Sequence, residues 1–187
     1  MAIKKSILSD TLPISLRSPI STLTDMSEQE VTFKVIGYIR SPFKDQDHTP
    51  IQPVFSEASG TVEVLPEYAP GLIDIEGFSH IILIYYFHKA QGYSLLQKPF
   101  MDNSQERGIF SIRHFARPNP IGFSVVELKR VRNNVLEVSG IDVLDGTPLL
   151  DIKPYVEQFD CKNIVKSGWA QGIDKTGKKH TPSGLRE

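Results

Sequence analysis

Residues 123–141 read FSVVELKRVRNNVLEVSGI, and this stretch predicts a β-hairpin. Two runs with the composition of β-strands, 123–132 and 135–141, flank the pair Asn133 and Asn134. Asparagine tolerates the positive φ that a two-residue hairpin turn requires. The stretch therefore predicts two antiparallel strands joined by a tight turn.

Three segments that precede the hairpin predict further strands. Residues 33–39 (FKVIGYI) form a β-rich run that ends at residues 40–42, RSP. Residues 61–65 (TVEVL) alternate polar and apolar side chains, which places Val62 and Val64 on one face of a half-buried strand. Residues 81–87 (IILIYYF) are apolar on both faces, so we expect this strand to lie centrally in a sheet.

Helical periodicity is hard to find in this chain beyond a possible turn or two near residues 66–75 or 93–97. This pattern argues against parallel βαβ construction and favours antiparallel strands. Many strands with few covering helices leave sheet edges exposed unless the sheet curls up. The sequence predicts a mainly β protein: an antiparallel, partly closed single-sheet β-barrel with few short helices.

Composition limits the compartment and the partners. The 187 residues are 40% apolar, and 21 lysines and arginines face 22 aspartates and glutamates, a net charge of −1. Any nucleic-acid contact must therefore come from local clustering of charge. The single cysteine, Cys161, excludes an intrachain disulfide and points to a reducing compartment. The longest apolar run is too short for a membrane span, and the N-terminus lacks a signal-peptide core, so we expect a cytoplasmic protein.

The chain is not uniform along its length. Residues 1–30 are rich in serine, threonine and leucine without a sustained period, which predicts a flexible N-terminal extension. A barrel domain is expected over residues 31–165. The glycine- and lysine-containing tail, residues 166–187, is expected to be mobile.

The sequence lacks the motifs of several common nucleotide-binding and metal-binding sites. It has no GxGxxG dinucleotide fingerprint, and the segment 177–179, GKK, is not followed by the hydroxyl residue of a phosphate-binding loop. His80 and His88 bracket the run 81–87, and on one strand they would lie about 26 Å apart, too far to share a metal. We therefore expect no metal site.

Two proline-punctuated segments predict a binding site: residues 113–122, RHFARPNPIG, and residues 142–155, DVLDGTPLLDIKPY. Proline fixes its own φ and biases the residue before it toward extended geometry, which holds Arg117, Asn119 and Lys153 out of helix. Each segment alone could be an ordinary turn. Together they carry more arginine, asparagine, aspartate and lysine than turns need, which favours a polar ligand site of basic character.

Five motifs occur in an order that resembles one family: IGYIRSPF at 36–43, TPIQP at 49–53, FSH at 78–80, RPNPIG at 117–122, and DGTP at 145–148 leading to DIKPY at 151–155. They resemble the TrmO family, also called YaeB or TsaA-like, over about residues 33–160. The resemblance implies an S-adenosylmethionine-dependent methyltransferase with a single-sheet β-barrel, usually a homodimer. Characterised members methylate N6 of threonylcarbamoyladenosine in tRNA, at the nucleotide after the anticodon.

Carried over residue by residue, the resemblance implies a cofactor pocket for S-adenosylmethionine. Its residues would be Pro53, Val54, Phe55, His88, Lys89, Arg113, Phe123, Val143, Leu144, Asp145 and Gly146. Backbone groups of residues 143–146 would hydrogen-bond the adenine and Phe55 would pack on it. Asp145 would favour the cationic sulfonium or bind a ribose hydroxyl.

The resemblance also implies residues that contact the tRNA substrate: Arg117, Asn119 and Lys153. Arg113, Arg117 and Lys153 would supply positive charge to the methionine carboxylate or to tRNA phosphates. The catalytic residues are not identified, because positioning the nucleophile in line can supply most of the rate. If a general base exists, His88 and Asp145 are candidates, and a structural or cofactor-binding role fits each of them equally well.

The sequence departs from the family pattern at two places. Residues 114–116, HFA, stand where members commonly carry Ser-Pro or Ser-Thr, and Val54 stands where a glycine is usual. His114 and Phe115 could stack on a base, or Phe115 could be buried. The chain ends soon after the predicted barrel, where longer bacterial members carry a further domain, and its basic tail could substitute for that domain.

These departures keep two alternative functions open. One is a non-catalytic barrel that binds S-adenosylmethionine or RNA as a sensor or adaptor. The other is a methyltransferase for another nucleotide or a small molecule, for which the altered segment 114–116 is the motivation.

Overall fold

The computed structural model describes residues 30–163 and 166–173. The chain divides into two units, residues 1–33 and 34–187. The second unit contains all the strands and helices described below. Almost all of the predicted N-terminal extension and most of the predicted tail lie outside the described residues, so the proposed domain boundaries stay predictions.

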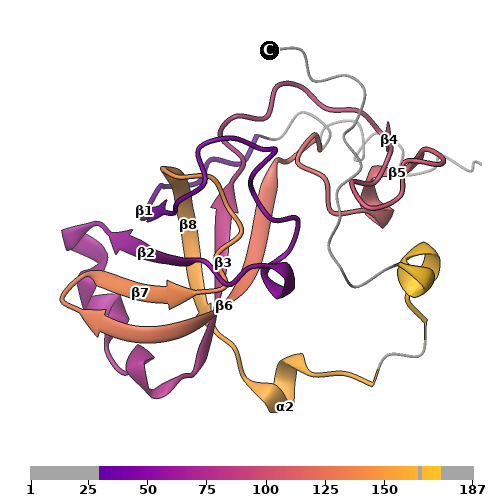
Figure 1. The fold of residues 1–187 in the computed structure, drawn as a ribbon. Coiled ribbons are helices and arrows are strands. Elements are labelled where there is room, and N and C mark those ends of the chain that lie inside the picture. The colour runs from indigo at the N-terminus through magenta and orange to yellow at the C-terminus, as the bar shows by residue number, and fades with distance from the viewer. Residues whose placement is uncertain (1–29, 164–165, 174–187) are drawn as a thin grey trace, which may run out of the picture. The chain divides into compact units, whose positions relative to one another are not determined.

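Six antiparallel strands close into a barrel in the order β1-β2-β7-β6-β3-β8 (Figure 1). They are β1 (Gly37–Arg40), β2 (Ser59–Val64), β3 (His80–Tyr86), β6 (Ile121–Arg132), β7 (Val135–Ser139) and β8 (Thr147–Pro154). The prediction of an antiparallel β-barrel is confirmed. Closure is complete, because β1 pairs with β2 on one side and with β8 on the other.

Short elements occupy the connections between the barrel strands. They are η1 (Pro53–Phe55), η2 (Pro66–Leu72), η3 (Ile75–Gly77), β4 (Leu96–Gln97), β5 (Arg107–Gly108), η4 (Ile109–Ser111), α2 (Glu157–Asp160) and η5 (Gly168–Gly172). The predicted turn near residues 66–75 is present as η2. The suggested helical turn at residues 93–97 is wrong, since Leu96 pairs with Gly108 between β4 and β5. In the described part of the chain, no helix is long and apolar enough to cross a membrane.

The hairpin of β6 and β7 forms as the sequence predicts. Asn133 has a φ of 54°, and Arg132 pairs with Val135 across the turn. The neighbouring Asn134 donates from Nδ2 to the backbone oxygen of Val64 at 2.6 Å, which fastens the turn to the end of β2. Local turn chemistry therefore fixes both the hairpin and its attachment to the barrel.

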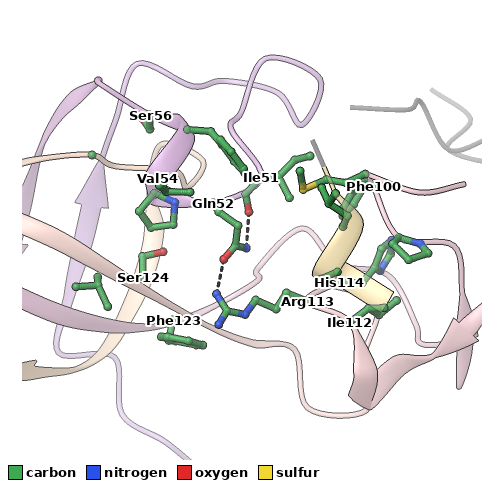
Figure 2. A pocket seen from close by; sticks show the side chains of 18 of the residues that line it. Ile51, Gln52, Val54, Ser56, Phe100, Ile112, Arg113, His114, Phe123 and Ser124 are labelled. Carbon is green, nitrogen blue, oxygen red and sulfur yellow. Dashed lines mark hydrogen bonds between the residues drawn. The ribbon is translucent and has the colours of Figure 1, made fainter. Parts of the chain in front are cut away.

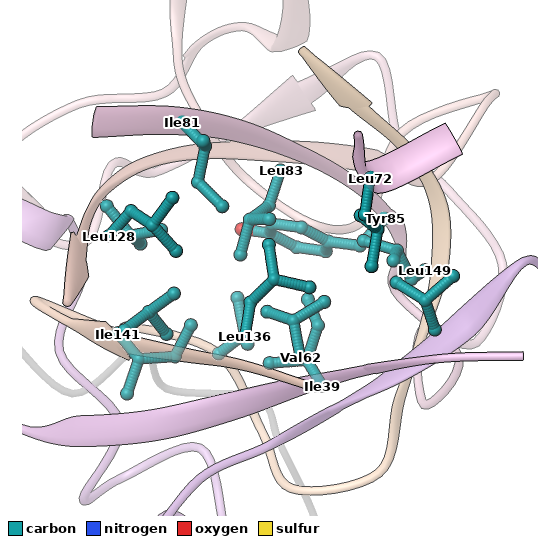
Figure 3. Packing of buried hydrophobic residues seen from close by; sticks show 14 residues of the cluster. Ile39, Val62, Leu72, Ile81, Leu83, Tyr85, Leu128, Leu136, Ile141 and Leu149 are labelled. Carbon is teal, nitrogen blue, oxygen red and sulfur yellow. The ribbon is translucent and has the colours of Figure 1, made fainter. Parts of the chain in front are cut away.

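Apolar side chains fill the interior of the barrel (Figure 3). Val62 and Val64 both point inward, with exposed fractions of 0% and 3%, as their alternation predicts. The strand β3 lies between β6 and β8, but every strand of a closed barrel has two neighbours, so the predicted central place does not distinguish it. Because side chains fill the interior, the space for a ligand must lie outside this core.

Tyr85 is the polar residue of the inward row on β3. Its hydroxyl lies 3.0 Å from Oγ of Ser124 on β6, which in turn donates to Oδ1 of Asp142 at 2.5 Å. The ring of Tyr85 lies directly against Gly122, its partner across the β3–β6 ladder, and a Cβ at that position would overlap the ring. Glycine at 122 therefore allows Tyr85 to reach Ser124.

Replacing Gly122 with alanine should destabilise the protein by about 2 kcal/mol, because the added methyl group overpacks against Tyr85 and Phe87. The matched control is Gly108→Ala, where a Cβ would meet no atom within 4 Å. Urea unfolding followed by circular dichroism measures both variants. Equal unfolding free energies for the two variants would contradict the close contact at Gly122.

Candidate functional site

Two adjoining cavities lie beside the barrel, with volumes of about 1080 Å³ and 760 Å³. The larger cavity is lined by η1, the outer face of β6 and η5. The smaller one is lined by residues 44–46, 49–52, 87–90 and 142–144, together with Tyr85 and Thr147. Both are lined by Ile51, Gln52, Phe100, Ile112, Arg113, His114 and Phe123. These shared residues form the boundary between the cavities.

Arg113 lies at the centre of this boundary (Figure 2). Its guanidinium donates a hydrogen bond to Oε1 of Gln52, and Nε2 of Gln52 donates to the backbone oxygen of Ile51 at 2.6 Å. The guanidinium also lies over the ring of Phe123, 4.8 Å from the centroid. Phe123 is 48% exposed, so it offers an open aromatic surface beside a cation.

The structure divides the predicted cofactor residues between the two cavities. Pro53, Val54 and Phe55 line the larger cavity. His88, Lys89, Val143 and Leu144 line the smaller cavity. Arg113 and Phe123 line both, so the boundary connects the two groups.

Asp145 and Gly146 do not line either cavity. The carboxylate of Asp145 accepts a hydrogen bond from Nζ of Lys44 at 2.7 Å and one from the backbone N–H of Ser41 at 3.1 Å. These bonds, the Lys44 bond foremost, lower the pKa of Asp145. Gly146 has a φ of 76° and donates its N–H to the oxygen of Ile39. Both residues fasten the loop after β7 to the end of β1.

The predicted tRNA-contact residues are dispersed. Arg117 lines the smaller cavity, and its guanidinium donates to the backbone oxygens of Ile112 and His114 at 3.0 Å and 3.4 Å. Asn119 is exposed and lines neither cavity. Lys153 is also absent from both linings and forms an ion pair with Asp151 on β8 at 2.7 Å. Of these residues, only Arg117 is part of the candidate site.

His114 is buried, with an exposed fraction of 6%. Its ring stacks on Phe100 at 4.7 Å between centroids, and its Nδ1 accepts the backbone N–H of Ala116 at 3.0 Å. Burial, with a further contribution from Arg117, lowers the pKa of His114 to about 4. The imidazole is therefore neutral at neutral pH, with its proton on Nε2.

Phe115 and His88 line the smaller cavity. Phe115 is half-buried and packs on Phe87 and Phe100, with centroids 6.4 Å and 5.8 Å apart. Burial and then the charge of Lys89 lower the pKa of His88. Phe115 is thus packed in an aromatic cluster that also forms a wall of the cavity, and His88 offers a neutral imidazole to it.

Asp142 is the site residue that sequence reasoning missed. It is 8% exposed, lines the smaller cavity and accepts the hydrogen bond from Ser124, which lines the larger one. Burial raises the pKa of Asp142 to about 7, although the bond from Ser124 opposes the shift. Its place directly after the apolar strand 135–141 was the available signal, but the spacing alone did not distinguish it from Asp145.

Comparisons with known proteins identify the family. Residues 38–161 match the model of the tRNA-methyltransferase O (TrmO) N-terminal domain. A probable S-adenosyl-L-methionine-binding protein of Pyrococcus abyssi is 51% identical over 142 residues, covering 75% of this chain and 77% of that protein. The tRNA (adenine(37)-N6)-methyltransferase of Escherichia coli is 37% identical over 149 residues, covering 74% of this chain.

Solved structures agree with this result. The crystal structure of TrmO from Pseudomonas aeruginosa superposes with a TM-score of 0.62 at 38% identity and covers 76% of this chain. The match spans 63% of the length of that structure and 63% of the Escherichia coli enzyme. The fold and motifs define a single-sheet barrel of the methyltransferase class. The chain belongs to the TrmO family, as its motifs predict.

Replacing Asp142 with asparagine should stabilise the protein at alkaline pH. The folded protein keeps the proton of Asp142 up to about pH 7, whereas an ordinary aspartate loses it near 3.8. The contribution of this group to the unfolding free energy therefore falls as pH rises through that interval. The gain of Asp142→Asn over the wild type should be small at pH 4 and on the order of 4 kcal/mol at pH 8.

Urea unfolding of the two proteins at pH 4, 6 and 8 measures this gain. Taking the difference between them removes the opposite dependence of His114, whose lowered pKa makes stability rise with pH. A gain that does not change with pH would show that Asp142 is ionised throughout.

Proposed function

We propose that this protein transfers a methyl group from S-adenosylmethionine to N6 of an adenine in tRNA, at threonylcarbamoyladenosine next to the anticodon. One observation carries the proposal. In this chain of the TrmO family, two cavities meet where the guanidinium of Arg113 lies over the ring of Phe123, beside the buried carboxylate of Asp142. The name of the Escherichia coli relative supports the same reaction and the same class of substrate.

The residues present fit the cofactor. S-adenosylmethionine combines an aromatic base, a cationic sulfonium and an α-carboxylate, and it supplies an already activated methyl group when bound. Phe55 and Phe123 offer aromatic surfaces for the base, and Lys89 and Arg117 offer positive charge for the carboxylate.

The residues of the chain have two tasks in this reaction. Arg113 and Phe123 hold the boundary between the cavities in one geometry through the Gln52 bond and the ring contact. The aromatic cluster of Phe87, Phe100 and Phe115 excludes water from the wall of the smaller cavity. Positioning and exclusion of water can supply most of the rate in a direct displacement.

Binding of tRNA would depend on local charge, because the net charge of the chain is −1. Lys89, Arg113 and Arg117 gather along the smaller cavity, and those that do not hold the cofactor carboxylate are our candidates for phosphate contacts. We include a cytoplasmic location in the proposal. Among the described residues, no three His, Cys, Asp or Glu side chains are grouped to hold a metal ion, and metal independence stays a prediction.

A second candidate function is binding of S-adenosylmethionine without methyl transfer. The observation that favours it is the name of the Pyrococcus abyssi relative, which states binding alone. The two functions differ in one measurable respect, since a sensor or adaptor would bind the cofactor without producing S-adenosylhomocysteine. A methyltransferase for another nucleotide or a small molecule would produce it with a different acceptor.

Arg113→Ala should weaken S-adenosylmethionine binding by about 10- to 100-fold, because it removes the cation and the charge-assisted hydrogen bond at the boundary. Titration calorimetry measures binding, and mass spectrometry of tRNA nucleosides measures transfer. The matched control is Arg132→Ala on β6, whose guanidinium pairs with Glu137 at 3.3 Å and lines neither cavity. Wild-type binding without methylated nucleoside would favour the sensor, and binding unaffected by Arg113→Ala would contradict the proposed site.

We also propose that the protein is a homodimer that pairs through the region of β4 and β5. Leu95, Leu96 and Phe110 are 57%, 56% and 78% exposed, and they are brought together by the β4–β5 pairing and the bond from the Ile109 N–H to the Leu95 oxygen. Light scattering after gel filtration should give the mass of a dimer, and Leu96→Asp should give a monomer. A monomeric wild type would refute the dimer.

A further inference from the structure

We propose that the carboxylate of Asp142 accepts the proton that leaves N6 of the acceptor adenine during methyl transfer. The inference rests on the proposed function and assigns a residue to a step for which the sequence offered only His88 and Asp145. Three observations support it. Asp142 lies between the cavities, hydrogen bonds orient its side chain, and the other candidate bases are either hydrogen-bonded already or less basic.

The chemistry of the acceptor requires a proton acceptor. N6 of threonylcarbamoyladenosine is part of a urea-like group, so its lone pair is delocalised into a carbonyl and into the purine. The N6–H bond breaks and its proton goes to a carboxylate oxygen of Asp142, while the N6 electron pair bonds to the methyl carbon. The carbon–sulfur bond breaks with its electron pair on sulfur, which yields a thioether. Charge balances, because a carboxylate and a sulfonium become a carboxylic acid and a neutral thioether.

The position of Asp142 fits this step. Asp142 lines the smaller cavity, and Ser124, to which it is hydrogen-bonded at 2.5 Å, lines the larger one, so the pair lies where the cavities adjoin. The Tyr85 hydroxyl lies 3.0 Å from Ser124 on the core side. In the described part of the chain, Ser124 is the one side chain that hydrogen-bonds Asp142, and it uses Oδ1. The backbone N–H of Asp142 also interacts with the carboxylate, and the residue keeps 8% of its surface exposed where it lines the smaller cavity.

The surroundings of Asp142 suit a proton acceptor. Burial raises the pKa of Asp142, and the hydrogen bond from Ser124 of β6 and then the positive charge of Arg113 oppose this rise. The hydroxyl of Tyr85 on β3 is a further titratable group that interacts with Asp142. The resulting value, about 7, is closer to the working pH of a cytoplasmic enzyme than the ordinary 3.8. A base with a pKa near the working pH combines availability with driving force.

Two of the competing groups are already engaged, and the third has a lowered pKa. Asp145 is paired with Lys44, which lowers its pKa and its basicity. Nδ1 of His114 accepts the Ala116 N–H, so it has no lone pair for a substrate proton. His88 lines the smaller cavity, but burial and Lys89 lower its pKa.

Single-turnover methylation of threonylcarbamoyladenosine-containing tRNA, at saturating S-adenosylmethionine from pH 5 to 9, tests the proposal. The wild-type rate should rise with pH and level off above about pH 7. Asp142→Asn should be about 10²- to 10⁴-fold slower, and its rate should lack this rise. Asp142→Glu should recover part of the rate. Glu137→Gln, which removes a carboxylate from the barrel surface, is the matched control and should behave as the wild type.

Two readouts do not depend on methylation. Calorimetry should show that Asp142→Asn binds S-adenosylmethionine within about threefold of the wild type, a change under 1 kcal/mol. Carbon-13 spectra of aspartate-labelled protein should contain a carboxyl resonance that titrates near pH 7 and is absent from Asp142→Asn.

The results distinguish a failure of the proposed proton transfer from a failure of the proposed methyltransferase function. Wild-type rates in Asp142→Asn would overturn the proton transfer and leave the methyltransferase in place. Strongly weakened cofactor binding with a wild-type rate at saturation would assign Asp142 to the sulfonium and also overturn it. No transfer by the wild type would overturn the proposed function and the proton transfer together.

Discussion

The pairing of β1 with both β2 and β8 is the constraint on which the rest of the structure depends. It closes the six barrel strands into one ladder without free edges. The approach of β1 to β2 is close, since a Cβ on Gly37 would meet the backbone oxygen of Glu63. Closure packs the inward side chains together, and it leaves the outer face of β6 and the loops around it to form the cavities.

The hydroxyls of Tyr85 and Ser124 connect the core to the site. A chain optimised for stability alone would not bury a carboxylate at position 142, because an ionised buried group destabilises the folded state. The carboxylate is accompanied by a tyrosine that only Gly122 accommodates. The buried Asp142 and the close contact between Tyr85 and Gly122 both restrict which residues can pack beside the cavities. A functional role at this place would account for both restrictions.

Sequence reasoning succeeded where the cause is local. The turn at Asn133, the inward direction of Val62 and Val64 and the choice of β over helix follow from short-range patterns. Sequence reasoning failed where the surroundings of a residue depend on contacts with segments distant in the sequence. Asp142 and Asp145 lie in one loop with similar neighbours, and the Lys44 pairing of one and the burial of the other arise from strands distant in sequence. Likewise, the β8 register places Lys153 opposite Ile82, away from the cavities.

The segment η5 contains an intrinsic fluorophore beside the larger cavity. Trp169, the single tryptophan of the chain, lies over the guanidinium of Arg107 at 5.0 Å and donates its indole N–H to the backbone oxygen of Ser111 at 2.7 Å. It also lines the larger cavity. Indole emission responds to nearby charge and polarity, so the fluorescence of the unmodified protein carries a signal from one defined place. Ligand entry into that cavity is therefore observable optically, without an added label.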